Sequence, residues 1–597
     1  MNPLNEYTAR REKWNSANQR LEKRFNAIGN WRLITALTFV LLAWLVWGAG
    51  SISSWWLLAP VAVFIALAVW HGRVVRERTF ARRAITYYDH GLARLADHWM
   101  GTGNTGERFS NPEHVYSGDL DIFGKGSLFE LVCTARTGSG ESMLAQWFQA
   151  PGSPKEIHAR QEAVRELSPK LDLREDLALL GEDVRAGVHA DGLGAWGSAP
   201  PVHFARYLRP LALLLAVGGV VLVLVFFAHL IPLWPFVAVL GCDFLLIARL
   251  RKRVAHVIAA IETPGHELAI LSLVLERLER ESFESPYLKR LRTSMDVGTL
   301  PASKRIAQFQ RWVATIDSSD HLLIRAIRPI LLWQEQLAMG VEAWRAEAGA
   351  HVGTWLWAVG EFEALSSLAS LSFEHPAWRF PVLDDHAYPV FEGASLRHPL
   401  LSSAKCVPND VSLGSQAGHC DLLIVSGSNM SGKSTLLRSI GLNTVLAWAG
   451  APVAAEQLRV SAMQIGASLR VVDSLQDGRS RFMAEITRLR QIVALTDGGP
   501  PVLFLLDELL SGTNSHDRRI GAAAIVHGLL RRGAIGLITT HDLALADLEK
   551  DRESKAGNMH FEDVIVGGRI EFDYRLRPGV VVRSNALELM RAVGLEV

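Results

Sequence analysis

The stretch from Gly427 to Ser434 constrains the fold of this chain more than any other. Two glycines separated by four residues are followed by a lysine and a hydroxyl residue, in the order Gly427, Ser428, Asn429, Met430, Ser431, Gly432, Lys433 and Ser434. The apolar run 422–425 before it predicts a strand, and the run 434–446 after it predicts a helix. A strand, a glycine-rich turn and a helix in this order predict a phosphate-binding P-loop.

Each part of the predicted P-loop has an expected role at a bound nucleotide. Its glycines let backbone N–H groups turn toward phosphate oxygens, and the amino terminus of the following helix adds a partial positive charge. Lys433 is expected to reach the β- and γ-phosphates, and the Ser434 hydroxyl to bind Mg²⁺. The predicted nucleotide-binding stretch therefore runs from Gly427 through Thr435.

Polar residues follow two later apolar runs of the same region. Asp507 and Glu508 come directly after one predicted strand, and His541 follows the next one. Parallel α/β sheets bind ligands at the carboxyl ends of their strands. Asp507 fits a residue that holds Mg²⁺, and Glu508 fits a residue that polarises the attacking water. His541 is placed to sense the γ-phosphate or to orient that water, so Lys433, Glu508 and His541 are the predicted catalytic residues.

Four apolar runs explain why 49% of the residues are hydrophobic and the mean hydropathy is +0.15. Each run is long enough to cross a bilayer core as a helix, and the runs are 33–50, 52–70, 211–228 and 231–248. Tryptophans lie near the ends of the first two, and arginines flank both pairs on their outer sides. The pattern predicts two transmembrane hairpins, 33–70 and 211–248, in a multi-pass inner-membrane protein with cytoplasmic soluble domains. The alternative is a set of buried core helices, which the tryptophans and charged flanks disfavour.

Two features near these runs each have two interpretations. Residues 1–32 place apolar residues at helical spacing among arginines and lysines. This pattern fits a basic amphipathic helix on an anionic membrane surface, or a helix packed on the protein itself. Asp243 lies inside the last apolar run, where an acid is a candidate functional residue. Its position near the basic end of that run favours snorkelling or a pair with Arg249.

The remaining regions separate into a helical body and an α/β domain. Residues 100–205 and 254–390 carry mostly helical periodicity and no catalytic spacing, whereas residues 391–597 alternate strands and helices. The predicted fold class is an α/β P-loop NTPase domain joined to a mostly α-helical body with two transmembrane hairpins. A net charge of +1 means that the chain as a whole has no positive field that would attract nucleic acid. The four cysteines lack the spacing of metal ligands.

The segment from Ser426 to Thr435, with its asparagine–methionine pair, resembles the P-loop of the MutS family of DNA mismatch-repair ATPases. Other stretches resemble the same family, and they are 480–485, 507–515, 539–541, 558–561, 574–579 and 584–586, with 126–129, 160–164 and 397–399 upstream. The resemblance covers about residues 118–205 and 255–597. It implies an ABC-type ATPase that uses ATP and Mg²⁺, works as a homodimer and binds DNA.

The resemblance also implies roles for residues that the motifs alone do not single out. Val407 and Asn409 become candidate adenine contacts. The loop of Thr513, Asn514 and Ser515 is expected to reach the γ-phosphate held by the neighbouring subunit. The family's serine in this loop falls on Asn514, whose amide is also able to donate a hydrogen bond.

Two departures from the family pattern bear on function. Arg481 stands where the family has a threonine, and the chain contains no Phe-x-Glu triplet like that of the family's mismatch-reading wedge. The expectation is a membrane-anchored variant in which a hairpin replaces the mismatch-reading domain. Two hypotheses remain: a membrane-anchored MutS-like ATPase that binds DNA, and a membrane mechanochemical ATPase with no DNA role.

Overall fold

The computed structural model places the chain in two compact units, one of Met1–Thr105 with Phe373–His375 and one of Gly106–Ser372 with Pro376–Val597. The structure describes residues 2–317, 330–384, 388–414, 420–428, 431–470, 481–510, 513–541, 543–550, 555–566 and 569–581.

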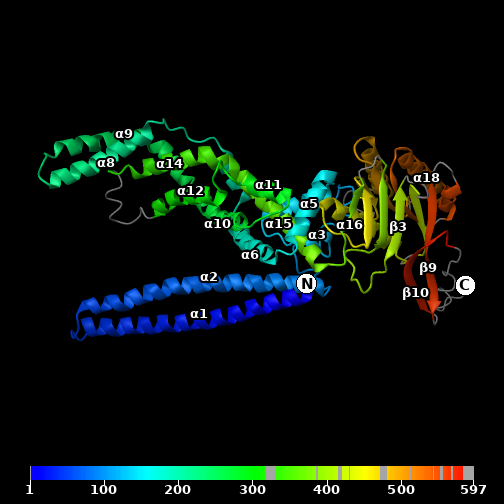
Figure 1. Cartoon of the computed structure of the whole chain (residues 1–597), viewed down its shortest axis with the longest axis horizontal. Coiled ribbons are helices and arrows are strands. Elements are labelled where there is room, and N and C mark those ends of the chain that lie inside the picture. Colours follow the sequence, from blue (N-terminus) through cyan, green and yellow to red (C-terminus); the bar gives the residue numbers. More distant parts are fainter. Residues whose placement is uncertain are drawn as a thin grey trace. The chain divides into compact units, whose positions relative to one another are not determined.

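The first unit is a long antiparallel pair of helices (Figure 1). Its elements are α1 (Pro3–Trp47), the short 3-10 helix η1 (Ser54–Leu57) and α2 (Leu58–Leu95). The side chain of Asn2 caps the amino terminus of α1, and a proline occupies the first turn, where it costs no hydrogen bond. The predicted segment 1–32 and the first apolar run lie on one helix with no break between them. The second apolar run begins before α2, because residues 52–53 are not helical.

A buried ionic cluster closes the end of this pair that is far from the apolar runs. The guanidinium of Arg94 binds both carboxylate oxygens of Glu374, the last residue of α15 (Val352–Glu374), at 2.7 and 2.5 Å. The hydroxyl of Tyr7 donates to the same carboxylate at 3.1 Å. Removing one partner of such a pair would leave a buried charge uncompensated, which typically costs about 3–5 kcal/mol. The cluster therefore joins α1 and α2 to Glu374, which belongs to the same unit.

The helical part of the second unit surrounds α15 and the short helices near residue 130. Capping residues explain several starting points, for example Ser153, which forms a capping box with Glu156 before α5. The helices are η2 (Glu107–Phe109), α3 (Leu128–Val132), α4 (Gly138–Gln149), α5 (Pro154–Leu167), α6 (Leu171–Gly187), α7 (Ala190–Ser198), α8 (Leu208–Phe227), α9 (Trp234–Ala259), α10 (Glu262–Glu279), α11 (Pro286–Ser294), α12 (Ala302–Asp317), α14 (Trp333–Ala348) and η4 (Gly349–His351).

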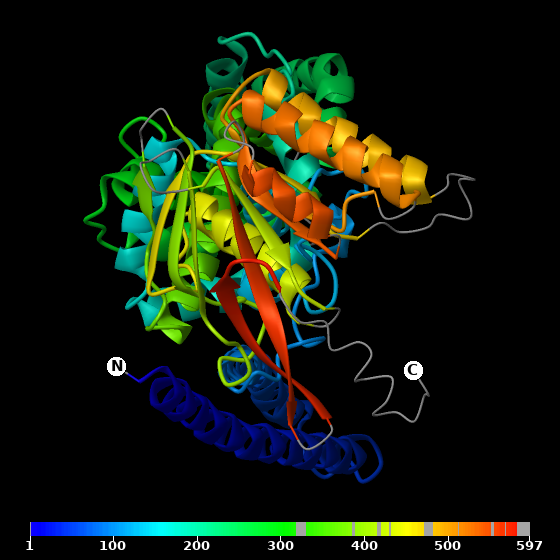
Figure 2. The ribbon, with the colours of Figure 1, turned by 90° about the vertical axis from the view of Figure 1, so that its right-hand side faces the viewer.

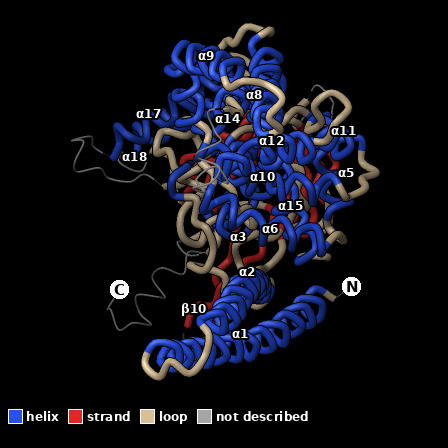
Figure 3. The backbone as a smooth tube through the Cα atoms, turned by 90° about the vertical axis from the view of Figure 1, so that its left-hand side faces the viewer, coloured by secondary structure: helices blue, strands red, loops and turns tan. Residues whose placement is uncertain are grey.

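Helices α8 and α9 form an apolar pair at one end of the second unit, and α14 packs against both (Figures 1 and 3). Among the described residues, three helices are long and apolar enough to cross a membrane, namely α1, α2 with its preceding turn, and α8. Helix α9 meets that criterion only together with α10, from which it is bent by 43°. Length and composition thus agree with three of the four predicted spans. The fourth, in α9, meets the criterion only if α9 and α10 are counted as one bent span.

Asp243 does not behave as the sequence suggested. It lies on the buried face of α9 with Leu246 and Leu250, and only 2% of its surface is exposed. Neither carboxylate oxygen has a hydrogen-bond partner within the described structure, so the predicted pair with Arg249 is wrong. Snorkelling is excluded as well, because the side chain faces the helix contacts. Spacing along one helix indicated proximity to Arg249, but only the packing of α9 determines the direction of the side chain.

Two sheets make up the α/β part of the second unit (Figure 2). The larger has the strand order β10-β9-β4-β8-β7-β6, in which β10 is antiparallel and the other neighbours are parallel. Its strands are β4 (Leu422–Ser426), β6 (Gln464–Ser468), β7 (Val502–Asp507), β8 (Ile535–Thr540), β9 (Ala556–Val566) and β10 (Arg569–Pro578). The smaller, ordered β1-β5-β2-β3, contains β1 (Val382–Asp384), β2 (Val390–Leu396), β3 (Asn409–Gly414) and β5 (Gln457–Ser461). Because β1 pairs with β5, the strands begin before residue 391.

The larger sheet is covered by helices, which explains why its central strands are continuous apolar runs. Residues of β4, β7 and β8 form one buried cluster with α17 (Arg481–Ala494) and α18 (Ser515–Arg531). The helix after the P-loop, α16 (Lys433–Ala449), is buried on nearly all sides, as its apolar sequence requires. The 3-10 helices η5 (Leu495–Asp497) and η6 (Leu543–Lys550) complete the domain. The α/β domain and the helical body predicted from the sequence are confirmed.

Candidate nucleotide site

The P-loop connects β4 to α16, as predicted, and its backbone needs two glycines. Gly427 has φ +150° and Gly432 has φ +107°, conformations that other residues rarely adopt. A Cβ on Gly427 would also lie 2.9 Å from the Ser431 hydroxyl oxygen. Asn429 and Met430 lie outside the described residues, so their predicted contacts stay predictions. Thr435 follows in the first turn of α16.

Lys433 folds back over its own loop. Its ammonium donates to the carbonyl oxygens of Gly427 and Ser428, both at 2.8 Å. Burial lowers the pKa of Lys433, and the carboxylates of Glu508 and Asp507 oppose that effect by favouring the charged form. A phosphate bound in the loop would offer the ammonium a charged partner in place of two neutral carbonyls, which is the stronger interaction.

The residues predicted to hold Mg²⁺ are in contact. The Ser434 hydroxyl donates to Asp507 Oδ2 at 2.5 Å, and Thr539 donates to the other carboxylate oxygen. Hydroxyl and carboxylate oxygens are the ligands that Mg²⁺ prefers, and the remaining positions are commonly filled by water and phosphate. The donor set therefore fits Mg²⁺, with Ser434 and Asp507 as its protein ligands.

Glu508 and His541 meet at the carboxyl ends of neighbouring strands β7 and β8. Their side chains are 2.6 Å apart, from His541 Nε2 to Glu508 Oε1, and both are partly exposed. Glu508 has φ +49°, an uncommon conformation for a non-glycine residue that costs about 1–3 kcal/mol. Its backbone N–H binds the Thr539 hydroxyl at 3.1 Å, which holds this conformation. The carboxylate is thus held beside His541 at the edge of the sheet where the P-loop also begins.

The loop after Glu508 is held by residues whose role the sequence did not specify. Leu510 also has positive φ, and its N–H donates to the buried carboxylate of Glu485 on α17 at 2.5 Å. Arg518 of α18 donates to the Leu510 carbonyl at 3.2 Å. Glu485 therefore links the stretch 481–485 to the loop that follows Glu508. Its sequence resemblance to the family was the only available signal for this link.

Thr513 and Asn514 lie at the start of α18, away from the P-loop of the same chain. Asn514 is the amino-terminal cap: its Oδ1 accepts from the Asp517 N–H at 2.8 Å, and its amide donates to the Asp517 carboxylate at 2.7 Å. In the described part of the chain, no hydrogen bond or ion pair joins either residue to the P-loop. The Ser515 side chain is outside the described residues.

Asn409, one of the two predicted adenine contacts, is hydrogen-bonded to β10 through its side chain. Its Oδ1 accepts from the Leu576 N–H at 2.7 Å, and its amide donates to the carbonyls of Tyr574 and Val407 at 3.0 and 3.4 Å. These bonds hold the bulge of β10, where the strand register shifts between Phe572 and Leu576. Asn409 therefore holds this part of β10 in place, and the adenine contacts predicted for Asn409 and Val407 stay predictions.

Tyr574 is the aromatic residue that the bulge presents to the P-loop. A Cβ built on Gly432 would lie 3.2 Å from Tyr574 Cδ1, so the ring is in contact with the loop. The ring is 42% exposed and offers a flat surface beside the phosphate site. The neighbouring strand β9 also contacts the loop, through Asp563, which accepts from the Ser428 hydroxyl at 2.7 Å. The sequence could not reveal this, because the bulge reverses the alternation of side chains.

We predict that a Tyr574→Ala variant binds ATP about tenfold more weakly, because aromatic stacking on a base is worth about 1–3 kcal/mol. Titration with a fluorescent ATP analogue measures this change. Tyr574→Phe should retain wild-type affinity, and Tyr388→Ala, at an exposed tyrosine of the same domain, is the matched control. Unchanged affinity in Tyr574→Ala would show that the base lies elsewhere.

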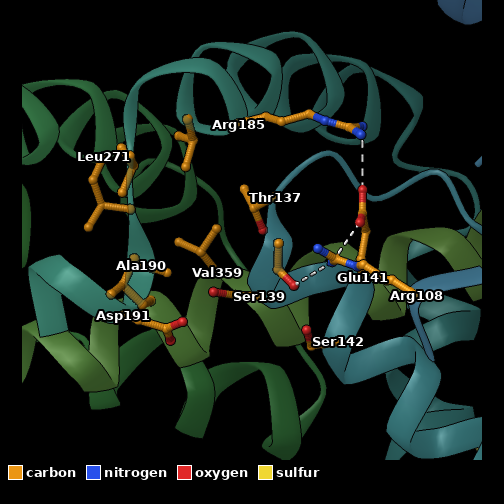
Figure 4. A pocket seen from close by; sticks show the side chains of 14 residues that line it. Arg108, Thr137, Ser139, Glu141, Ser142, Arg185, Ala190, Asp191, Leu271 and Val359 are labelled. Atoms are coloured by element: carbon orange, nitrogen blue, oxygen red, sulfur yellow. Dashed lines mark hydrogen bonds and ion pairs between the residues drawn. The ribbon is translucent and has the colours of Figure 1, made fainter. Parts of the chain in front are cut away.

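A separate cavity of about 480 Å³ lies in the helical body (Figure 4). The buried carboxylate of Glu141 binds Arg108 at 2.7 Å and Arg185 at 3.4 Å inside it. Asp191 adds a second negative charge to the lining. The charges of the two arginines are thus balanced, and this cavity does not offer the net positive charge that a polyphosphate requires.

Comparison with known proteins agrees with this geometry. Residues 423–596 match the family described as MutS domain V. The DNA mismatch repair protein MutS of Myxococcus xanthus is 28% identical over 525 residues, which are 79% of this chain and 56% of that protein. MutS of Natronomonas pharaonis is 34% identical over 47% of this chain and 31% of its own length. The protein named MutS 2 of Halobacterium salinarum is 29% identical over 53% of this chain and 37% of its own length.

The chain spans about half, or less, of the length of these relatives, so the similarity concerns the family and not a whole activity. It extends beyond the P-loop to the helical body, since the Myxococcus protein aligns with most of the chain. Together with the matched domain, the similarity supports a MutS-family protein whose carboxyl-terminal region holds the family's ATPase domain.

Proposed function

We propose that this protein is a membrane-anchored ATPase that binds ATP with Mg²⁺ and hydrolyses it at a site shared between two subunits. One observation carries the ATPase assignment: the P-loop, Asp507, Glu508 and His541 converge at the carboxyl ends of β4, β7 and β8. A phosphate cradle, a carboxylate–hydroxyl pair for a metal and a His–Glu pair are the parts that phosphoryl transfer to water requires.

Each residue has a distinct task in this mechanism. The P-loop N–H groups and Lys433 bind the β- and γ-phosphates and stabilise the charge that develops on them. Ser434 and Asp507 would hold Mg²⁺, which supplies further positive charge at the phosphates when bound. Glu508 accepts a hydrogen bond from the attacking water and polarises it, and His541 holds the Glu508 carboxylate in place.

The apolar helices support the membrane assignment. On α1 and α2, large apolar side chains from Trp31 to Trp70 are exposed over much of their surface, and α8 shows the same pattern from Leu211 to Phe227. Soluble proteins rarely expose apolar areas of this extent to water. Arginines flank the apolar stretches of α1 and α2, as expected where helices leave the bilayer on the cytoplasmic side.

The topology gives a direct prediction. In a variant without the four native cysteines, single cysteines at Gly50 and His229 should react with an impermeant thiol reagent added to intact cells. Gly50 lies in the connection between α1 and α2, and His229 lies in the connection between α8 and α9. A cysteine at Asn104 should stay unlabelled until the cells are opened. Labelling of position 104 in intact cells would contradict cytoplasmic soluble domains.

Binding of DNA is proposed from the relatives, whose names describe DNA mismatch repair proteins. The alternative is a mechanochemical ATPase that acts at the membrane without DNA. Its support is the net charge of +1, which is low for a protein that binds a polyanion over a broad surface.

Filter binding of the detergent-purified protein separates these two functions. We expect retention of labelled duplex, mismatched or branched DNA, with affinity that falls steeply as salt rises because phosphate contacts release counterions. The series is run with and without ATP. The Lys433→Ala variant is included because its DNA binding should no longer change when ATP is added. Absence of retention at low salt, in a preparation that hydrolyses ATP, would favour the alternative.

A further inference from the structure

The second unit contains an apolar cavity of about 400 Å³ beside α8. Residues of α8, α12 and α14 line it, and α14 packs against both other helices (Figure 3). Its walls are almost entirely apolar, and they are formed by Leu213, Ala216, Val217, Val220, Val221, Trp312, Leu331, Trp333, Gln336 and Leu337. A cavity of this size falls in the range of ligand pockets, about 300–1,000 Å³.

The cavity opens along the exposed face of α8. Ala216 is buried at 5% exposure, whereas Leu213 and Val217 on either side of it are each 55% exposed. Protein interiors are otherwise packed with few voids larger than a water molecule. An open cavity of apolar lining is therefore suited to an apolar group that enters from the surroundings of α8.

A positive charge lies at one edge of the cavity. The guanidinium of Arg209 is 5.2 Å from the centre of the Trp312 ring, and Trp312 is itself part of the cavity wall. Arg209 precedes Leu213 by one helical turn, so it lies beyond the apolar lining at the amino-terminal end of α8. Its guanidinium has the geometry to bind a phosphate through two hydrogen bonds.

We infer that this cavity binds one acyl chain of an anionic phospholipid, whose phosphate rests on Arg209. Such a lipid matches both features of the site: its acyl chain fits the apolar space, and its phosphate fits the cation at the edge. The bound chain fills the space between α8 and α14 and so couples the lipid to the helical body. This inference rests on the proposed insertion of α8 into a bilayer.

Photo-cross-linking in nanodiscs tests the site. The full-length protein is reconstituted in phosphatidylcholine with a phosphatidylglycerol probe that carries a diazirine on one acyl chain, and cross-linked residues are mapped by mass spectrometry. We expect cross-links on Val217 and Leu337. Ala216→Phe, which fills the cavity, should reduce them about tenfold. Leu214→Phe adds similar bulk at a residue that is 68% exposed and outside the lining, and should leave them unchanged.

A second comparison tests the charge. Arg209→Gln should remove the preference for the phosphatidylglycerol probe over a phosphatidylcholine probe with the same diazirine chain. ATPase activity equal to wild type shows that each variant is folded. Equal labelling by the two probes in the wild-type protein would overturn the role of Arg209.

The remaining outcomes separate failure of the cavity from failure of membrane insertion. If Val217 and Leu214 are cross-linked equally and Ala216→Phe changes neither yield, the probe has labelled the protein from the surrounding bilayer. That result would overturn the inference. Attachment of the probe to neither residue would place α8 outside lipid and would overturn the proposed membrane anchor as well. Cross-links on Leu214 but not on Val217 would mean that lipid does not enter the cavity, and this result would also overturn the inference.

Discussion

A Glu508→Gln variant should bind ATP with near wild-type affinity and hydrolyse it about 10²–10⁴-fold more slowly, the range expected for loss of a general base. Glutamine keeps the shape of the side chain and is still able to contact His541. It cannot carry the negative charge that polarises a water. The P-loop, Lys433 and the Ser434–Asp507 pair are untouched, so binding of the phosphates is retained.

Steady-state phosphate release measures turnover, and a fluorescent nucleotide measures binding. The matched control is Glu562→Gln, because Glu562 also contacts a histidine, His560 at 3.4 Å, in the same domain. That variant should hydrolyse ATP at the wild-type rate. Wild-type turnover in Glu508→Gln, or an equal loss in Glu562→Gln, would refute the assignment of Glu508 as the water-polarising group.

Mixing two inactive variants should restore activity if the ATP site is shared between subunits. Lys433→Ala removes the phosphate counter-charge from one subunit's P-loop. Asn514→Asp would place a carboxylate against the neighbour's γ-phosphate while keeping a residue that caps helices well. Random mixing should restore about a quarter of wild-type activity, because half of the dimers then hold one intact site of two.

The geometry of α18 supports the proposal that a second subunit completes the ATP site. Asn514 caps the amino terminus of this helix, where partial positive charge favours an anion, yet it makes no contact with the P-loop of its own chain in the described structure. Among the described residues, those of a single subunit would thus contact a γ-phosphate from the P-loop side only. Dimer formation would supply the other side, and anchoring in a membrane would raise the effective concentration of subunits.

Asn514→Ser is the matched control for this experiment, since serine also caps helices and offers a hydroxyl donor in place of the amide. It should remain active alone. A melting temperature close to wild type in Asn514→Asp verifies that the new carboxylate, beside Asp517, does not unfold the domain. A mixture that stays inactive, from protein that sediments as a monomer with ATP, would contradict the shared site.

Local patterns were sufficient for the nucleotide site and the layout of the chain. The P-loop spacing predicts its own strand and helix, since only glycine readily adopts φ +150° and +107° at positions 427 and 432. The sequence alone predicted that Asp507 and Glu508, at the end of β7, lie near His541, which follows β8. The reason is that parallel strands end at the same edge of a sheet. Long apolar runs likewise predict long helices whatever surrounds them.

Tertiary structure alone decided which side chains outside these motifs meet. The bulge in β10 directs Tyr574 to the P-loop, and the side chain of Asn409 holds that bulge. The packing of α9 turns Asp243 inward, away from Arg249. Spacing along a chain determines which residues share a face of a helix or strand. The direction in which that face points depends on contacts between residues hundreds of positions apart, such as Arg94 with Glu374, and only the folded chain specifies them.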